Sequence, residues 1–432
     1  MLETVLKAGG EAGFATVEAF AEKVVRQETE GGDGPLSLHE VHGDRLAVRA
    51  FRDSGDPLGF SLSAPDARQV RRGFADLAAG GALDRRKGWG HLLPRSAARS
   101  RLNIYDPGIE AWDDSRAADL RERLRECLVS FPGLKLRRFR FSCALRKVYL
   151  ANSRGFAAKY KKSLFQVRAR FQAGDHQLEL SESRTHFRNF DPPRLVARAA
   201  NLLGALDAEP EHAPAGLEFA IFSPEASAQV LKEFSPGLML DRPGLRERAL
   251  AASSRVTLLD NPALDEQPGS VPFDDEGTAA AERCLLNKGV TVAAASDIRS
   301  AFLRGQASTG NGFRDEAGVF PRTRFSNLYF KPGNAPLAQL LDRVAEGALV
   351  YLVRREGPGR LPGEAVFTAH GFRFARGEVG RPLQFRLSAS LRSWLLHVAE
   401  VSRELRFFHG RANVGSPYLL LQGRTVEGGF SL

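Results

Sequence analysis

The chain has 432 residues, which is too long for one ordinary domain and suggests roughly two to three structural units. Hydrophobic residues make up 43% and charged residues 26%, a globular composition that excludes a disordered or collagen-like chain. The net charge is +10, no apolar run approaches the roughly 18 residues of a membrane span, and the first residues lack a signal-peptide pattern. We therefore expect a soluble, cytoplasmic protein without a membrane partner.

The positive charge is concentrated in one segment. From Cys127 to Gly174 there is no Asp or Glu, while twelve Lys and Arg residues give this segment a charge of +12 and leave −2 for the rest of the chain. A basic chain ordinarily suggests a nucleic-acid partner. Few aromatic residues here are placed for base stacking and no binding motif is present, so we rank nucleic-acid binding low. Whether the segment contacts substrate, a partner or nothing stays open.

The first half is predicted to alternate between amphipathic helices and strands. In chain order we expect an amphipathic stretch over 2–14, a strand over 16–30, a hairpin over 45–64, helices over 67–80 and 115–131, strands over 146–156, 162–174 and 176–183, and a helix over 193–206. In residues 162–174, Phe165 and Val167 share one face, whereas Arg168 and Arg170 share the other. The basic side chains should therefore lie mostly on the polar face of an antiparallel sheet.

The second half begins after a Pro- and acid-rich segment, residues 207–216, which is the best candidate for a domain boundary. We predict an α+β protein with an N-terminal domain over 1–208 and a β-rich C-terminal domain over 215–432. The predicted elements of the second half are a strand over 217–222, helices over 224–234, 277–289 and 337–345, a strand over 347–355, a hairpin over 364–390, a helix over 391–405 and a strand over 418–428.

The spacing of the cysteines and histidines does not match that of a metal site or of a disulfide framework. Cys127, Cys143 and Cys284 are widely spaced, so we expect three small buried apolar residues. His39 and His42 are the only neighbouring histidines, and a solvated strand is favoured over a metal site there.

Carboxylates gather in the sequence around Asp274, Asp275, Glu276 and Gly277, with Asp260 upstream. They could form a metal or general-base site, but they lack the spacing of a calcium loop. We favour the alternative that Asp274 or Asp275 caps a helix beginning near Gly277.

Two loops rich in small polar residues could offer backbone N–H groups to a peptide. One contains Asn152, Ser153 and Gly155. The other contains Ser308, Thr309, Gly310 and Asn311. Either loop could also be only a tight turn, and nothing singles out a nucleophile.

Several segments together resemble the TldD/PmbA family, which has been labelled a modulator of DNA gyrase. The most specific match is an ordered series of short motifs: D-x-P at 260–262, P-F-D-D-E-G at 272–277, N-K-G-V at 287–290 and S-T-G-N at 308–311. Weaker matches flank this series on both sides, so that the resemblance spans nearly the whole chain.

The resemblance implies a peptidase connection. TldD-type subunits carry H-E-x-x-x-H and a late Cys that bind a catalytic metal, implied to be zinc. The corresponding segment here, residues 224–237, has no His, and no Cys follows Cys284. The chain therefore resembles the TldE/PmbA type, a subunit without its own cofactor or catalytic residues.

The implied partner is a TldD-type subunit that holds the zinc in a heterodimeric metallopeptidase acting on unfolded or modified peptides. This subunit would close the partner's cleft and help bind substrate through the two polar loops and through edge strands around 148–152 and 162–171. The alternatives are a metal-independent homodimer of unassigned activity and a module that binds an anionic partner.

Overall fold

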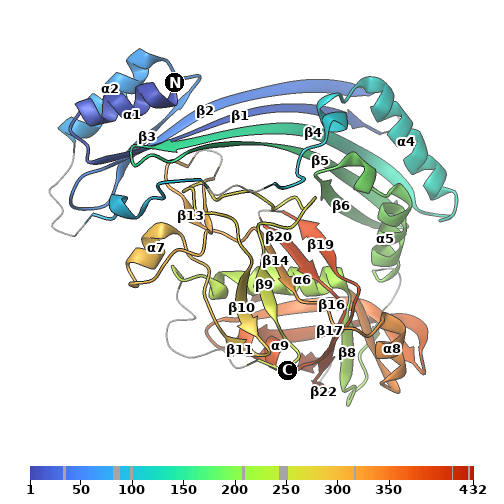
Figure 1. Ribbon diagram of the computed structural model, residues 1–432. Coiled ribbons are helices and arrows are strands. Elements are labelled where there is room, and N and C mark those ends of the chain that lie inside the picture. The colour runs from blue at the N-terminus through green and yellow to red at the C-terminus, as the bar shows by residue number, and fades with distance from the viewer. Residues whose placement is uncertain are drawn as a thin grey trace.

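The structure is a computed structural model that describes residues 1–32, 36–80, 88–97, 101–206, 210–242, 252–315, 318–410, 412–426 and 429–432. A long curved sheet forms the N-terminal half, and a β-rich C-terminal half lies beneath it (Figure 1). The α+β class is confirmed. The domain limits stay a prediction, and residues 207–209 of the expected boundary lie outside the described residues. No helix in the described ranges is both long and apolar enough to cross a bilayer.

The N-terminal sheet has the strand order β3-β2-β1-β4-β5-β6, and every pairing in it is antiparallel. Its strands are β1 Thr16–Gly31, β2 Ser37–Phe51, β3 Leu58–Ser63, β4 Lys135–Asn152, β5 Ala157–Ala173 and β6 His176–Arg184. The alternation of apolar residues located these strands correctly. β4, however, begins eleven residues before the predicted start at residue 146, in a stretch where arginines separate the apolar positions.

Helices cover one face of this sheet at both of its ends (Figure 1). They are α1 Leu2–Glu11, α2 Ala67–Ala79, the short α3 Pro107–Glu110, α4 Asp114–Leu128 and α5 Pro192–Gly204. Val17 and Ala19 of β1 pack against α1 and α2. The next residue, Phe20, instead packs on the opposite face with Phe273 of the C-terminal half. The middle of the sheet is therefore buried on both faces.

The C-terminal half contains two further large sheets. One has the order β11-β10-β9-β14-β20-β19, and the other has the order β18-β21-β8-β15-β16-β17-β23-β22 with β7 also paired to β17. Their strands are β7 Glu211–His212, β8 Phe219–Phe222, β9 Leu258–Asp260, β10 Arg283–Asn287, β11 Val290–Thr291, β14 Asn327–Phe330, β15 Glu346–Pro358, β16 Glu364–Ala375, β17 Glu378–Ser390, β18 Val398–Val401, β19 Arg406–His409, β20 Asn413–Ser416, β21 Leu419–Gln422, β22 Arg424–Val426 and β23 Gly429–Ser431, with the separate pair β12 Gly312–Phe313 and β13 Arg322–Thr323.

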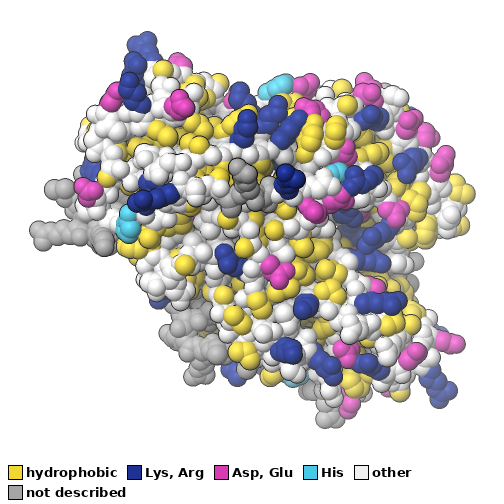
Figure 2. Space-filling model, viewed as in Figure 1, with side chains coloured by type: hydrophobic (Ala, Val, Ile, Leu, Met, Phe, Trp, Pro, Cys, Tyr) yellow, Lys and Arg dark blue, Asp and Glu magenta, His cyan; other side chains and the backbone are white. Residues whose placement is uncertain are grey.

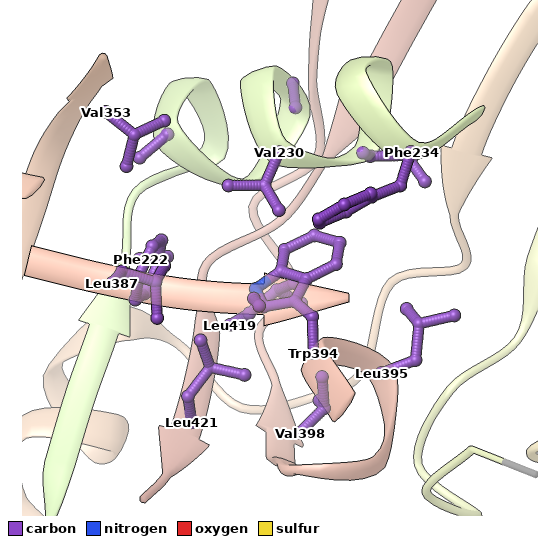
Figure 3. Packing of buried hydrophobic residues seen from close by; sticks show 14 of the residues in the cluster. Phe222, Val230, Phe234, Val353, Leu387, Trp394, Leu395, Val398, Leu419 and Leu421 are labelled. Carbon is purple, nitrogen blue, oxygen red and sulfur yellow. The ribbon is translucent and has the colours of Figure 1, made fainter. Parts of the chain in front are cut away.

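The α-helices in the described part of this half are α6 Pro224–Phe234, α7 Ile298–Phe302, α8 Leu337–Asp342 and α9 Leu391–Leu396. The main core lies between α6 and the sheets. Trp394 of α9 is fully buried there and meets Phe330 edge-on with ring centroids 5.6 Å apart. Figure 3 shows its indole beneath Val230 and Phe234 of α6 and beside Leu419.

One predicted helix is wrong and another is too long. Residues 277–289 contain β10 instead, because Leu285 and Leu286 are buried beside β9 and the preceding loop is bonded to other loops. The predicted helix over 391–405 ends at Leu396, after which β18 pairs with β21. In both cases strand pairing with distant segments overrides a local helical pattern.

Candidate functional site

The acidic loop, residues 272–278, connects parts of the chain that are distant in sequence. Asp274 accepts hydrogen bonds from the backbone N–H groups of Glu276 (3.0 Å), Thr278 (2.8 Å) and Gly312 (2.9 Å). Asp275 accepts one from the backbone N–H of Arg314 (2.7 Å). Burial and the neighbouring Glu276 raise the pKa of Asp274 well above its ordinary value. Neither aspartate caps a helix, so the predicted cap is wrong, and both organise loops instead.

Two glutamates and two arginines form a buried ion network between the two halves of the chain. Glu18 of β1 and Arg49 of β2 come from the N-terminal sheet, whereas Glu276 and Arg314 come from C-terminal loops. Arg49 donates to Glu18 from Nε (2.9 Å) and Nη2 (2.7 Å), and to Glu276 from Nη1 (2.8 Å). Arg314 donates from Nη2 to Glu18, and its guanidinium lies over the ring of Phe20.

The two glutamates of this network have opposite pKa shifts. Burial would raise the pKa of Glu18, but the charges of Arg49 and Arg314 outweigh burial and hold this pKa below its ordinary value. At Glu276 burial prevails over the charge of Arg49, so the pKa is raised. Glu18 is therefore the anionic centre on which both guanidiniums converge.

A cleft of about 860 Å³ opens beside the network, which forms part of its wall through Arg49 and Glu276. Asp297 also lines the cleft, but it is engaged in capping α7, where its Oδ1 accepts from Ser300 N (2.6 Å). Glu18 and Arg49 were not among the residues predicted from the sequence. The available signal was a charged residue inside an apolar strand segment, since Val17, Ala19 and Phe20 surround Glu18.

The loop at 308–311 is held to Asp260 rather than left open to a ligand. Asn311 donates from Nδ2 to Asp260 Oδ2 (2.6 Å), and Thr309 donates from Oγ1 to Asn311 Oδ1 (2.7 Å). Ser308 donates to the carbonyl of Ser296 (3.2 Å). Burial raises the pKa of Asp260 to about 6, although several hydrogen bonds oppose that shift.

The turn after β4 is also internally bonded. Asn152 Oδ1 accepts from Arg154 N (2.9 Å), its Nδ2 donates to Pro94 O (2.9 Å), and Ser153 Oγ accepts from Val17 N (3.0 Å). Gly155 adopts φ +104°, a value that favours glycine. The side chains of both predicted loops therefore make internal bonds, which leaves backbone groups as the source of any peptide contact.

The acidic loop lies between these two polar loops and contacts both. A Cβ on Gly277 would lie 3.0 Å from the ring of Phe156, and a Cβ on Gly310 would lie 3.3 Å from Thr278. Phe156 also meets Phe273 edge-on at 5.6 Å. The structure thus brings the sequence-predicted residues into one region, with the acidic loop at its centre.

The predicted edge strands need correction. Residues 148–152 pair with β1 on one side and with β5 on the other, so they lie inside the sheet. Residues 165–171 likewise pair with both β4 and β6. Only residues 157–164 of β5 have β4 alone as a strand neighbour, and there Ser163 N donates to Ile104 O (3.0 Å). The free edge is therefore shorter than predicted and begins directly after the Asn152 turn.

Carboxylates from outside the acid-free segment pair with many of its basic residues. Arg138 and Arg140 pair with Glu30, Arg146 with Glu22, Lys161 with Glu110 and Arg170 with Glu179. Arg168 and Arg170 are exposed as the alternation predicted. The pairing lowers the positive potential that the sequence alone indicates.

Lys162 departs from the expected polar face because it is buried beneath the C-terminal half. Its Nζ donates to the carbonyls of Pro268 and Ser270 (2.9 Å to the latter). Burial, with a smaller effect from the charge of Arg146, lowers the pKa of Lys162 to about 7. Lys162 therefore helps to attach the sheet to the C-terminal half rather than to face solvent.

This buried amine should make stability depend on pH. Between pH 7 and about 10.5 the unfolded chain binds the proton that folded Lys162 has lost, so the free energy of unfolding should rise with pH. We expect Lys162→Met to abolish this rise, which should be on the order of a few kcal/mol, in urea titrations from pH 7 to 10. Lys159→Met, at an exposed position of the same strand, should keep it. Equal pH slopes for wild type and Lys162→Met would contradict the prediction.

The other candidate ligands do not converge on a metal. His42 pairs with Glu40 (2.8 Å) on an exposed strand, and Cys143 is buried while Cys127 and Cys284 are half-buried and free. On α6, the carboxylate of Glu225 accepts hydrogen bonds from Arg198 Nε (2.6 Å) and Arg198 Nη2 (2.5 Å). Across the described ranges, no group of three or more His, Cys, Asp or Glu could hold a metal ion. The side chains on α6 do not fit a zinc ion, so we derive no metal-dependent step for this chain.

Residues 220–428 match the family model of the PmbA/TldA metallopeptidase C-terminal domain. This half of the chain therefore matches the C-terminal domain of the TldD/PmbA family. The match covers β8 to β22, which includes α6, the acidic loop and the loop at 308–311. The motif series that suggested the family in the sequence lies inside this range.

Sequence relatives carry protease names. A "Metalloprotease" of Methanothermobacter thermautotrophicus is 31% identical over 190 residues, which is 41% of each chain. A "Zinc metalloprotease TldD homolog" of Saccharolobus solfataricus is 29% identical over 177 residues, covering 40% of this chain and 38% of the relative. The chain thus aligns with only about two fifths of the length of these relatives.

One solved structure shares the fold over nearly the full length. TldE from Thermococcus kodakarensis superposes with a TM-score of 0.85 at 18% identity, covering 97% of this chain and 98% of the other. At this identity the likeness shows the fold alone. It extends to the N-terminal sheet, which the family model does not reach.

Proposed function

We propose that this chain is a non-catalytic, TldE-like subunit that pairs with a TldD-type zinc metallopeptidase acting on unfolded or modified peptides. The observation that carries the proposal is how the acidic side chain on α6 is bonded. Its Glu225 is held by two hydrogen bonds to Arg198, so the carboxylate is neutralised by a guanidinium and is not free to bind a metal or to act as a base. The match of residues 220–428 to the family model and the full-length likeness to a TldE fold support the proposal.

The contribution to substrate binding would come from backbone groups. An extended peptide can add to the edge of β5 at residues 157–162, which adjoins the Asn152 turn and ends before the bond from Ser163 N to Ile104 O. The cleft beside the ion network is large and polar enough to accommodate an extended peptide. In this proposal the subunit closes the partner's cleft and narrows the choice of substrate to chains that can lie extended.

Co-expression with a TldD-type protein that carries H-E-x-x-x-H tests the proposal. We expect a one-to-one complex on gel filtration, zinc in the complex but not in this chain alone, and peptide hydrolysis that a chelator abolishes. Purified alone, this chain should hydrolyse no peptide. Chelator-sensitive hydrolysis by the isolated chain, or a stable homodimer that excludes the partner, would overturn it.

A further inference from the structure

A second cavity, of about 240 Å³, lies between the two halves of the chain and away from the acidic loop. Residues of β6 and α5 form its N-terminal wall, and β19 with the first turn of α6 forms the opposite wall. These elements lie side by side in Figure 1. Figure 2, in the same view, shows several Lys and Arg side chains at the surface of this region. The cavity has the volume of about eight liquid waters, which is room for a small ligand or one end of a chain.

Arginines dominate the charge of this cavity. Arg184 pairs with Glu182, and Arg198 pairs with Glu225. Arg194 and Arg406 line the same cavity, and their guanidiniums make no hydrogen bond or ion pair within the described part of the chain. His409 adds no charge, because burial lowers its pKa to about 3. Two uncompensated positive charges therefore remain in one cavity.

The two unpaired guanidiniums lie close enough to affect each other. After burial, the charge of Arg406 is the largest cause that lowers the pKa of Arg194. Like charges repel, and because both side chains are exposed, water screens part of this repulsion. A carboxylate can accept from two guanidiniums at once and would relieve the repulsion.

The remaining walls are aromatic and can donate further hydrogen bonds. Tyr351 and Tyr418 line the cavity, and neither hydroxyl bonds to another described residue. Burial raises the pKa of both phenols, so each keeps its proton as a donor at neutral pH. Phe407 and Phe408 supply apolar surface beside them. Spare donors next to apolar rings suit an anion attached to an apolar group.

We propose that this cavity binds a carboxylate carried beside an apolar side chain, and that its ligand is the C-terminal residue of a peptide. The choice of a peptide rests on the proposed function, whereas the choice of a carboxylate rests on the cavity alone. Arg194 and Arg406 bind the carboxylate, the two tyrosines donate to it, and the phenylalanines contact the side chain. Glu182 and Glu225 disfavour a more highly charged anion such as phosphate.

Direct binding to the isolated full-length chain tests this inference. The probes are a fluorescent tripeptide ending in phenylalanine with a free carboxylate, and the same peptide as its C-terminal amide. We expect the free acid to bind at least tenfold more tightly. Arg194→Gln and Arg406→Gln should each weaken binding of the acid at least tenfold and leave binding of the amide unchanged. Tyr418→Phe should also weaken binding of the acid, but to a smaller degree.

The matched control is Arg68→Gln, an exposed arginine on α2 at the other end of the sheet, which should change neither affinity. Equal affinities for acid and amide, or displacement of the acid by inorganic phosphate at equal concentration, would overturn the inference. Circular dichroism on each variant separates lost binding from lost folding. Because no partner is present in this assay, failure of complex formation and failure of the carboxylate site are distinguishable.

Discussion

Glu18→Gln should destabilise the protein by about 3–5 kcal/mol, measured as a lower urea midpoint at pH 7. The substitution keeps the size of the side chain but removes the charge on which Arg49 and Arg314 converge. It leaves Arg49 bonded to the carboxylate of Glu276, while the guanidinium of Arg314 keeps only its bonds to the backbone carbonyls of Asp275 and Val319 among the described residues. An uncompensated buried charge is among the most costly single changes in a folded protein.

The effect of Glu18→Gln should depend on pH in a defined direction. The folded pKa of Glu18 lies below the ordinary value of 4.5, so its stabilising contribution is complete above pH 4.5 and is lost as the pH falls through the folded pKa. The difference between wild type and variant should therefore be constant at neutral pH and shrink in acid. A difference that grows in acid would contradict this assignment.

Glu346→Gln provides the control for the ion network. Glu346 pairs with Arg373 at 2.7 Å, but both side chains are largely exposed. Water screens such a pair, so its loss should cost less than about 1 kcal/mol. If Glu18→Gln cost no more than this control, the buried network would not be what attaches the N-terminal sheet to the C-terminal half.

The N-terminal sheet could be predicted from the sequence because its strands obey a local rule. Phe165 and Val167 alternate with Gln166 and Arg168, and burial follows the same period. The burial of Lys162 could not be found in this way. Its strand has the same polar–apolar alternation, and the C-terminal residues that cover it are more than a hundred positions away.

The predicted helix cap in the acidic loop was wrong for a related reason. A run of acids before an Ala-rich segment is a reasonable helix start, and only Gly312 and Arg314, some forty residues later, show that Asp274 and Asp275 bond elsewhere. The family motifs pointed to this region without indicating its geometry. The roles of Glu18 and Arg49 required both halves of the chain to be in place.

Phe156→Ala should also destabilise the protein by about 3–5 kcal/mol. Phe156 follows the turn after β4 and is 1% exposed. Its ring packs on Gly277 and meets Phe273, so one side chain of the N-terminal half fills a space in the acidic loop. Removing the ring leaves a cavity, and the surrounding loops cannot collapse into it because Asp274 and Asn152 fix their backbones.

Phe156→Leu separates packing from the mere presence of an apolar residue at this position. Leucine retains part of the volume, so it should cost about 1–2 kcal/mol and lie between wild type and alanine. Urea unfolding of the three proteins, followed by circular dichroism, gives the ranking. If Phe156→Ala lowered the free energy of unfolding as little as Phe156→Leu, the loops would be able to close around the vacant space. The acidic loop would then be a flexible connection between the halves, and their attachment would rest on the ion network of Glu18 and on Lys162.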